Sequence, residues 1–317
     1  MIKYNDIHRL FYFSIDNLVC RNLFKILYKY THPKNYKHNR YYWPYYRVER
    51  NTYNGIKKIF FKNHLIVDNS ESIFIQKKCM LVATGPSIKQ IPIEIFSQKD
   101  IDYFGVNGAI ALEGIKFKYY VIIDHNFINK KFDLVIKILQ SNCIFFTTAR
   151  CLDLILRKIS YDDIYCKIKI IELITEGEID IFLGSHTCAN PHPQHYFIEN
   201  KKGFSKNIQN ALFDYFTVAY VALQIIYGLG SKEIYLAGLD MNNFNKPRFY
   251  EKNENKQPTM LDYHCEEVLQ AFQVAAKFLK SEEIQVYNLS QNSAVTAFQK
   301  VDPQYGLVGS VALRNYN

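Results

Sequence analysis

The sequence lacks long apolar runs, and its cysteines follow no recognisable pattern. The most apolar early segment, residues 10–30, is interrupted by Asp16, Arg21, Lys25 and Lys29. It therefore contains neither a stretch of about 18 apolar residues, as a membrane span requires, nor the uncharged core of a signal peptide. The seven cysteines are odd in number and form no Cys-x-x-Cys pair, which is typical of free thiols in a reducing compartment. These absences predict a cytoplasmic protein.

Several catalytic and metal-binding signatures are also missing. No Gly-x-Ser-x-Gly or His-Glu-x-x-His motif occurs, which argues against the acyl-transfer and metalloprotease classes that carry them. The cluster of His186, Cys188, His192 and His195 has a spacing that matches no standard zinc pattern. We therefore predict no metal site. Glycine and proline are few, while 48% of residues are hydrophobic and 22% charged, which excludes a disordered or collagen-like chain.

Positive charge is concentrated at the start of the chain. Residues 1–50 hold ten Lys and Arg against three acids, a net charge of +7, whereas the remaining 267 residues carry only +2. Nine tyrosines and the single tryptophan, Trp43, lie in the same segment. Such a segment suits phospholipid headgroups, lipopolysaccharide phosphates or nucleic acid; the alternative is a solvated basic face with packed aromatics. We divide the chain into a basic, aromatic N-terminal extension, residues 1–75, and a main domain, residues 76–317.

The pattern within each part predicts its elements. In the extension we expect a helix over residues 17–30 and an aromatic run, residues 41–46, packed on the main domain or on a membrane. In the main domain, compact apolar runs alternate with helical patterns. Strands are expected at 79–83, 102–106, 119–123, 143–147, 233–237 and 284–289, and helices at 132–139, 214–229 and 261–279. This alternation predicts an α/β fold with a Rossmann-like, mostly parallel sheet flanked by helices.

Small and polar residues follow four of these strands. They form the segments Thr84-Gly85-Pro86-Ser87, Asn107-Gly108, Asp124-His125-Asn126 and Gly238-Leu239-Asp240. Because ligands of such sheets bind at the carboxyl ends of the strands, we expect a nucleotide-type ligand there. Gly85 lets the backbone approach a phosphate, Ser87 can donate to it, and a helix opening after this turn favours an anion. The alternative is a tight turn without a ligand.

Five residues are candidates for the chemistry. Asp124 and Asp240 suit binding of ribose hydroxyls, orientation of an acceptor or proton abstraction, or else cap the next helix. Arg248 and Tyr250 are good donors to a leaving phosphate, unless they belong to an ordinary surface loop. His264, at the start of the last long helix, is either a general base or a structural residue.

The block between residues 203 and 250 resembles the Kdo transferases of the lipopolysaccharide inner core, the RfaZ/WaaZ type. The similarity rests on Gly203-Phe204-Ser205-Lys206-Asn207-Ile208, Thr217-Val218-Ala219-Tyr220, Gln224, Tyr227, Gly238-Leu239-Asp240 and Pro247-Arg248-Phe249-Tyr250. Weaker matches extend it over residues 78–293. That family is in turn similar to bacterial CMP-sialic acid sialyltransferases of the Campylobacter type.

The resemblance implies a GT-A-like sialyltransferase variant of the fold and an inverting, metal-independent transfer of Kdo from CMP-Kdo to the inner core of lipopolysaccharide, with no cofactor besides the CMP-sugar donor. A CMP-sialic acid dependent sialyltransferase is the alternative, and a non-enzymatic module that binds anionic polymers is a remote one. The implied donor nucleotide and phosphate site comprises Thr84, Gly85, Pro86, Ser87, Asn107, Gly108, Asn126, Thr217, Gly238, Arg248 and Tyr250; the implied catalytic residues are His264, Asp124 and Asp240.

The expected partners follow from that reaction. They are the donor and a lipid A–core acceptor, without nucleic acid. The acceptor is bound to a membrane, so we expect the protein to be peripheral on the inner membrane and to contact its surface through residues 1–50.

Overall fold

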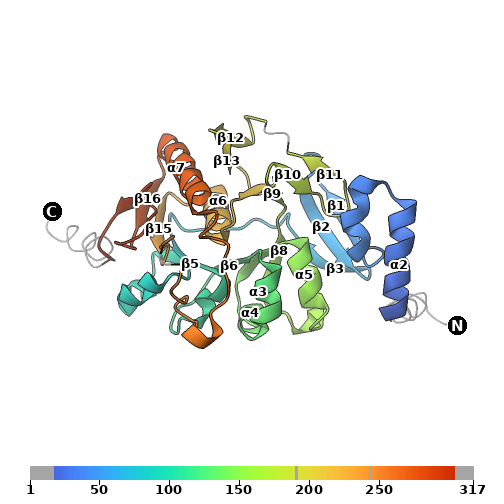
Figure 1. Ribbon diagram of the computed structural model, residues 1–317, viewed down its shortest axis with the longest axis horizontal. Coiled ribbons are helices and arrows are strands. Elements are labelled where there is room, and N and C mark those ends of the chain that lie inside the picture. The colour runs from blue at the N-terminus through green and yellow to red at the C-terminus, as the bar shows by residue number, and fades with distance from the viewer. Residues whose placement is uncertain (1–17, 190–191, 243, 304–317) are drawn as a thin grey trace.

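An eight-stranded parallel sheet forms the centre of the molecule. The computed structural model describes residues 18–303 apart from 190–191 and 243 (Figure 1). The strand order is β17-β16-β15-β4-β5-β6-β7-β8, and every pair is parallel. The strands are β4 (Lys78–Val82), β5 (Ile101–Val106), β6 (Tyr119–Ile122), β7 (Ile144–Thr147), β8 (Lys167–Ile170), β15 (Glu233–Ala237), β16 (Gln285–Asn288) and β17 (Gln299–Lys300).

The six predicted strands and the α/β fold are therefore confirmed. The sequence did not reveal two edge strands: β17 has only two residues, and the lysines of β8 interrupt the apolar run that marks a buried strand.

Helices cover both faces of the sheet. They are α3 (His125–Lys130), α4 (Phe132–Leu139), α5 (Ala149–Leu156), α6 (Val218–Leu229) and α7 (Cys265–Ser281). Successive side chains of a strand point to opposite faces, so Met80 and Val82 of β4 join the core shared with α3, α4 and α5. Cys79 and Leu81 join the core shared with α6 and α7. The apolar runs of the central strands are thus explained by burial on two sides.

The helix predicted over residues 214–229 begins four residues later than expected. Leu212–Asp214 forms a strand, β14, which pairs in parallel with β9 (Leu173–Thr175). Phe216 then takes a positive φ of 58°, and Thr217 occupies the N-cap of α6. The helix ends at Gly230, whose φ of 101° gives the left-handed cap that glycine allows. The expected start was wrong because an apolar strand and an apolar helix adjoin without a polar break.

Short strands fill the region of residues 150–205 that showed no regular pattern. One small sheet has the order β11-β10-β9-β14, and β12 pairs with β13. The new strands are β10 (Glu178–Asp180), β11 (His186–Cys188), β12 (Tyr196–Glu199) and β13 (Lys202–Ser205). Single-turn 3₁₀ helices complete the main domain: η2 (Pro86–Gln90), η3 (Ile93–Ser97), η4 (Asn107–Ala111), η5 (Tyr161–Asp163) and η6 (Asn253–Asn255).

The described part of the N-terminal extension is a helical segment followed by an antiparallel meander. Its elements are α2 (Leu18–Thr31), η1 (Lys34–Tyr41), β1 (Tyr46–Arg50), β2 (Ile56–Phe61) and β3 (His64–Asp68). The predicted helix is confirmed. Ile59 and Val67 belong to the same core as Met80, and the rings of Tyr42 and Phe182 lie 4.9 Å apart. The aromatic run therefore packs on the protein. The domain boundary at residue 75 stays a prediction.

The order of the sheet reverses between β4 and β15. β4 is the first strand of the sheet along the chain, and the chain adds strands on one side of it through β8 before crossing to β15 on the other side. Helices that follow the two neighbouring strands leave on opposite faces, which opens a crevice at their carboxyl ends. The topology therefore places the expected ligand site beside Ala83–Pro86 and Gly238–Met241.

Candidate functional site

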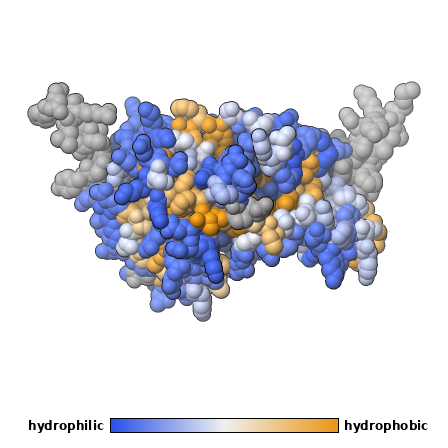
Figure 2. Space-filling model, turned by 90° about the horizontal axis from the view of Figure 1, so that it is seen from above, coloured by the Kyte–Doolittle hydropathy of each residue, from blue (hydrophilic) through white to orange (hydrophobic). Residues whose placement is uncertain are grey.

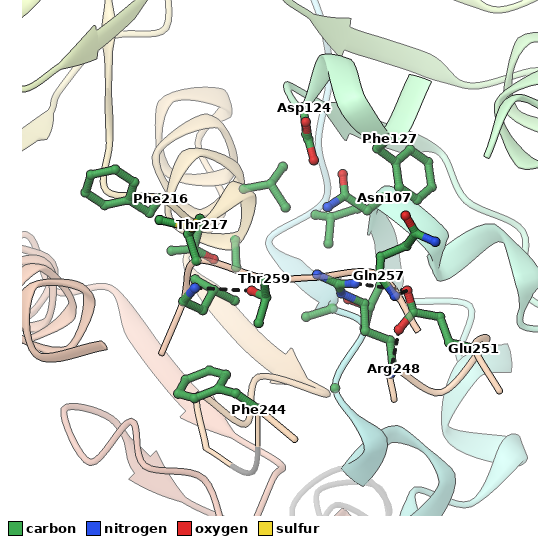
Figure 3. Close-up of a pocket in the computed structure, with 18 of the residues that line it drawn as sticks. Asn107, Asp124, Phe127, Phe216, Thr217, Phe244, Arg248, Glu251, Gln257 and Thr259 are labelled. Atoms are coloured by element: carbon green, nitrogen blue, oxygen red, sulfur yellow. Dashed lines mark hydrogen bonds and ion pairs between the residues drawn. The ribbon is translucent and has the colours of Figure 1, made fainter. Parts of the chain in front are cut away.

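A cavity of about 610 Å³ lies at this position. Its wall comes from the ends of β4, β5, β6 and β15, the start of α6, and the loop of residues 242–261 that leads to α7 (Figure 3). Most of the predicted site residues line it: Thr84, Gly85, Pro86, Asn107, Asp124, Asn126, Thr217, Gly238, Asp240, Arg248 and Tyr250. Ser87, Gly108 and His264 stand behind this wall.

The turn after β4 is held by hydrogen bonds within the protein. The Gly85 N–H donates to the Gly238 carbonyl at 2.9 Å. The Ser87 N–H donates to Asp240 Oδ2 at 2.9 Å, and the Ser87 hydroxyl donates to Asp240 Oδ1. The sequence led us to expect that these groups face a phosphate, but their N–H and O–H donors are directed at protein oxygens. The helix after the turn is η2, a 3₁₀ helix of five residues. The structural reason is Asp240, a residue that is only 8% exposed and whose carboxylate fixes the turn.

The end of β5 brings an unpaired polar atom to the cavity. Asn107 has a φ of 45°, and its buried Oδ1 has no hydrogen-bond partner among the described residues. Its side chain points into the space between Asp124 and Arg248 (Figure 3). Gly108 contributes by having no side chain, because a Cβ there would lie 2.2 Å from the Tyr250 ring. Gly108 therefore leaves room for Tyr250 to lie against the end of β5.

Asp124 combines exposure with a capping bond. Its carboxylate accepts a hydrogen bond from the Asn126 N–H at 2.8 Å and caps α3. The side chain is nevertheless exposed at the rim of the cavity. Partial burial and the nearby Arg150 lower the pKa of the adjacent His125 below its usual value. The capping role that the sequence left open is thus confirmed, and a direct role in chemistry stays a prediction.

The N-terminus of α6 forms part of the cavity wall. Thr217, Val218 and Ala219 line the wall, and the first turn of this twelve-residue helix has no acidic residue. The first N–H groups of a helix have no intrahelical acceptor, and its dipole favours negative charge. This end of α6 therefore has the chemistry to attract an anion, which the sequence led us to expect at the turn of Gly85.

The loop after β15 contributes Arg248, whose side chain is positioned by an ion pair. Glu251, a fully buried side chain, accepts hydrogen bonds from the Arg248 N–H at 3.0 Å and from Arg248 Nη1 at 2.9 Å. This pairing aims the guanidinium of Arg248 toward the middle of the cavity (Figure 3). Burial raises the pKa of the neighbouring Tyr250 above its usual value, so its hydroxyl stays a donor. Four lysines add positive charge to the wall: Lys130, Lys131, Lys246 and Lys256.

His264 does not line the cavity, but its ring contacts a residue that does. It occupies the N-cap of α7, and its ring stacks on Phe216 with centroids 3.6 Å apart. Its Nδ1 is 3.7 Å from Glu267 Oε2. Phe216 itself lines the cavity (Figure 3). The predicted histidine therefore supports a residue of the wall and is not itself part of that wall.

Sequence reasoning missed Asp214. The residue ends β14 and lines the cavity, but the sequence placed it at the first position of a helix. Its buried Oδ1 has no hydrogen-bond partner among the described residues. Burial, together with the charge of Asp124, raises the pKa of this carboxyl from 3.8 to about 6, although the Phe216 N–H donates to it. A signal was present in Thr217, an N-cap residue three positions later, which marks the preceding residues as a separate segment.

The structure shows no metal-binding cluster in its described part, where no three His, Cys, Asp or Glu side chains converge suitably. His186 belongs to the cluster whose spacing matched no standard zinc pattern. Its Nδ1 lies 2.8 Å from Asp180 Oδ1, and its Nε2 lies 3.0 Å from Glu178 Oε2. Among residues 18–303, with the gaps noted above, no helix has the length and apolar character to cross a membrane.

The C-terminal part of the chain matches a known family. Residues 198–301 match the family described as 3-deoxy-D-manno-octulosonic acid transferase WaaZ. The resemblance expected from the sequence is thereby confirmed over this segment, which includes β13, α6, β15, the loop with Arg248 and α7.

Individual relatives agree with this family match. A probable 3-deoxy-manno-octulosonic acid transferase of Escherichia coli strain K12 is 33% identical over 94 residues, which are 30% of this chain and 32% of the relative. A protein of the same description from Salmonella typhimurium is 30% identical over 93 residues, which are 29% of this chain and 34% of the relative. The chain thus spans about a third of the length of the curated relatives it matches.

Two solved structures are similar to this chain at low sequence identity. The Maf glycosyltransferase of Magnetospirillum magneticum is 15% identical, with a TM-score of 0.45 over 74% of this chain and 35% of that chain. The sialyltransferase CstII of Campylobacter jejuni, in complex with the substrate analogue CMP-3FNeuAc, is 19% identical, with a TM-score of 0.40 over 71% of this chain and 86% of that chain.

Proposed function

We propose that the protein is a glycosyltransferase that moves Kdo from CMP-Kdo to the core of lipopolysaccharide. One observation carries this proposal: the segment that matches the Kdo transferase family also builds the chemically equipped side of the cavity. That side contains Asp214, Thr217, Arg248, Tyr250 and Glu251. The remaining wall, from β4, β5 and β6, lies at the position where a doubly wound sheet binds nucleotides.

The cavity suits a donor with two negative groups. CMP-Kdo carries a phosphate and a sugar carboxylate, and the wall offers the N-terminus of α6, Arg248 and lysines to pair with them. The bond from the sugar to the phosphate breaks through an oxocarbenium-like state, so charge develops on the departing phosphate. Arg248 and Tyr250 are placed to donate to it. We propose that this set performs an inverting transfer without a metal ion, on a GT-A-like sialyltransferase variant of the fold.

The test is the release of CMP by the purified full chain, offered CMP-Kdo or CMP-sialic acid separately, with rough lipopolysaccharide as acceptor. We expect faster release from CMP-Kdo, a mass gain of one Kdo on the acceptor, inverted anomeric configuration and the same rate in EDTA. Preference for CMP-sialic acid would instead identify a sialyltransferase. Turnover of neither donor would contradict the proposed class of enzyme and leave a binding module.

We further propose that α2 docks on the cytoplasmic surface of the inner membrane, where the acceptor is anchored. Val19, Leu23, Ile26 and Tyr30 share one face of the helix, with exposed fractions of 73, 63, 54 and 85%. Figure 2 shows hydrophobic residues among hydrophilic ones at the end of the molecule where α2 lies. Residues 18–48 contain seven Lys and Arg and no acid. An apolar face with basic flanks matches an anionic bilayer surface.

Co-sedimentation with vesicles tests this docking. We expect the full chain to bind vesicles of phosphatidylglycerol and phosphatidylethanolamine and not vesicles of phosphatidylcholine. Leu23→Asp should reduce binding about tenfold, because it loses roughly 1–2 kcal/mol of apolar burial. The matched control is Ile93→Asp, an exposed apolar residue on η3. Equal effects of the two variants would contradict a role for α2.

A further inference from the structure

The four carboxylates that line the cavity differ in their bonding. Asp240 has both oxygens engaged by Ser87. Glu251 is fully buried and accepts from Arg248 with both oxygens. Asp124 caps α3 and is exposed. Asp214 alone of these four combines burial with a carboxylate oxygen, Oδ1, that has no hydrogen-bond partner among the described residues.

The local backbone holds Asp214 in place. β14 pairs with β9 through the register Asp214 to Thr175, and the Phe216 N–H donates to the Asp214 carboxyl. Phe216 adopts a positive φ of 58°, which is uncommon for a bulky residue. This turn places Asp214 directly before the N-terminus of α6, the element best suited to the anionic groups of the donor.

An unpartnered buried oxygen is costly unless a ligand uses it. The group that it lacks is a hydrogen-bond donor, and a sugar hydroxyl entering the cavity is such a donor. A base must lie within hydrogen-bond reach of the proton that it removes. In this arrangement the His264 ring is stacked on Phe216, and each oxygen of Asp240 and Glu251 already accepts a hydrogen bond from the protein.

We propose that Asp214 is the base that accepts the proton of the acceptor hydroxyl, an assignment that rests on the proposed function. The acceptor oxygen forms a bond to the anomeric carbon of the donor sugar while the bond from that carbon to the phosphate oxygen breaks. The electron pair of the broken bond leaves with CMP. The hydroxyl proton passes to the Asp214 carboxylate, which then loses it to solvent.

The surroundings of Asp214 suit this role. Burial and the charge of Asp124 raise its pKa to about 6, and a base with a pKa near the working pH is efficient because it is ionised and still takes a proton readily. The charged group that acts on Asp214 is Asp124 at the start of α3, which His125 follows in the chain. His264, at the start of α7, stacks on the neighbouring Phe216. The rate should therefore rise with pH along a limb near pH 6.

The experiment compares Asp214→Asn with the wild type and with Asp133→Asn, a matched control on the exposed side of α4. CMP release from CMP-Kdo with acceptor present, CMP affinity and the pH profile are measured for each full-length protein. We expect Asp214→Asn to lower kcat at least 100-fold, to keep CMP affinity within about threefold, and to lose the limb near pH 6. Asp214→Ser provides a second neutral variant should the first not fold.

The outcomes separate the two proposals. A wild type that turns over CMP-Kdo beside an Asp214→Asn variant with near-normal kcat would overturn the assignment of the base alone. So would a variant whose loss of kcat is matched by loss of CMP binding, because Asp214 would then shape the donor site. A wild type that releases CMP from neither donor would overturn the proposed function, and the role of Asp214 with it.

Discussion

The two sides of the cavity are built on opposite principles. On the side of the β4 turn, the Gly85 N–H donates to the Gly238 carbonyl, and the Ser87 N–H and hydroxyl donate to the Asp240 carboxylate. On the side of α6, Asp214 retains an unpaired oxygen and Phe216 adopts a rare backbone conformation. The first side, which we call the frame, is fixed by its own hydrogen bonds. The second side has polar groups that a ligand can use. Polar residues at strand ends are therefore not equivalent, although they gather at one edge of the sheet.

The largest effect on stability is expected from adding a methyl group at Gly85, in the frame. In Gly85→Ala the added Cβ would lie 2.5 Å from Asp240 Oδ2 and 2.6 Å from the Gly238 carbonyl oxygen, so the variant should lose about 3 kcal/mol of unfolding free energy. The control is Gly114→Ala, at φ +81° with open space around it, which should lose about 1 kcal/mol. Urea denaturation measures both. Similar losses would show that the turn is not tightly packed.

The ligand side should show the opposite response. Neutralising Asp214 removes a carboxyl whose pKa rises from 3.8 to about 6 on folding. A raised pKa means that the folded state holds the proton more tightly, so this group costs stability as pH rises through the interval from about 4 to 6. Asp214→Asn should therefore be more stable than the wild type by up to about 3 kcal/mol above pH 7, and not at pH 4.

Denaturation at the two pH values provides the measurement, with Asp133→Asn as the control that should show no such dependence. A variant that is less active yet more stable would establish that Asp214 is retained for function. A loss of stability at pH 7 would instead show that Asp214 stabilises the fold, as the residues of the frame do.

Arg248 is expected to have a smaller effect, confined to the donor. Arg248→Lys loses the planar guanidinium that Glu251 aims into the cavity, and it should weaken CMP binding about 10- to 100-fold. Titration calorimetry measures this, with Arg47→Lys as the control, because Arg47 pairs with Glu49 on the remote strand β1. Unchanged affinity would mean that Arg248 stabilises the loop and does not contact the phosphate.

The smallest effect is expected at His264. Its ring stacks on Phe216 from behind the wall, so His264→Gln should lose roughly 1 kcal/mol of ring packing and lower kcat less than about fivefold. The measurement is the same CMP release assay. A fall of more than 100-fold, with Asp214→Asn still active, would move the role of base to His264 and reverse the comparison of the two sides.

The sequence predicted the frame well because its signals are local. Apolar runs followed by Thr84-Gly85-Pro86 or Gly238-Leu239-Asp240 indicate buried strands and the turns that end them, and parallel strands bring these ends to one edge. The same logic assigned the wrong partner to Ser87. The hydrogen bond from Ser87 to Asp240 spans 153 residues, a separation over which no local pattern carries information.

What the sequence alone determined is the order of the main strands and helices, the edge of the sheet at which the cavity lies and the resemblance of residues 203–250 to Kdo transferases. These follow from periodicity, turn residues and local motifs. The tertiary structure decided which polar groups are free to act. Asp214 gains its burial where β14 pairs with β9 and packs against α6, and the charge of Asp124 raises its pKa further. Both oxygens of Asp240 accept hydrogen bonds from Ser87, which is distant in the sequence. Whether a carboxylate is available for chemistry depends on neighbours that only the folded chain brings together.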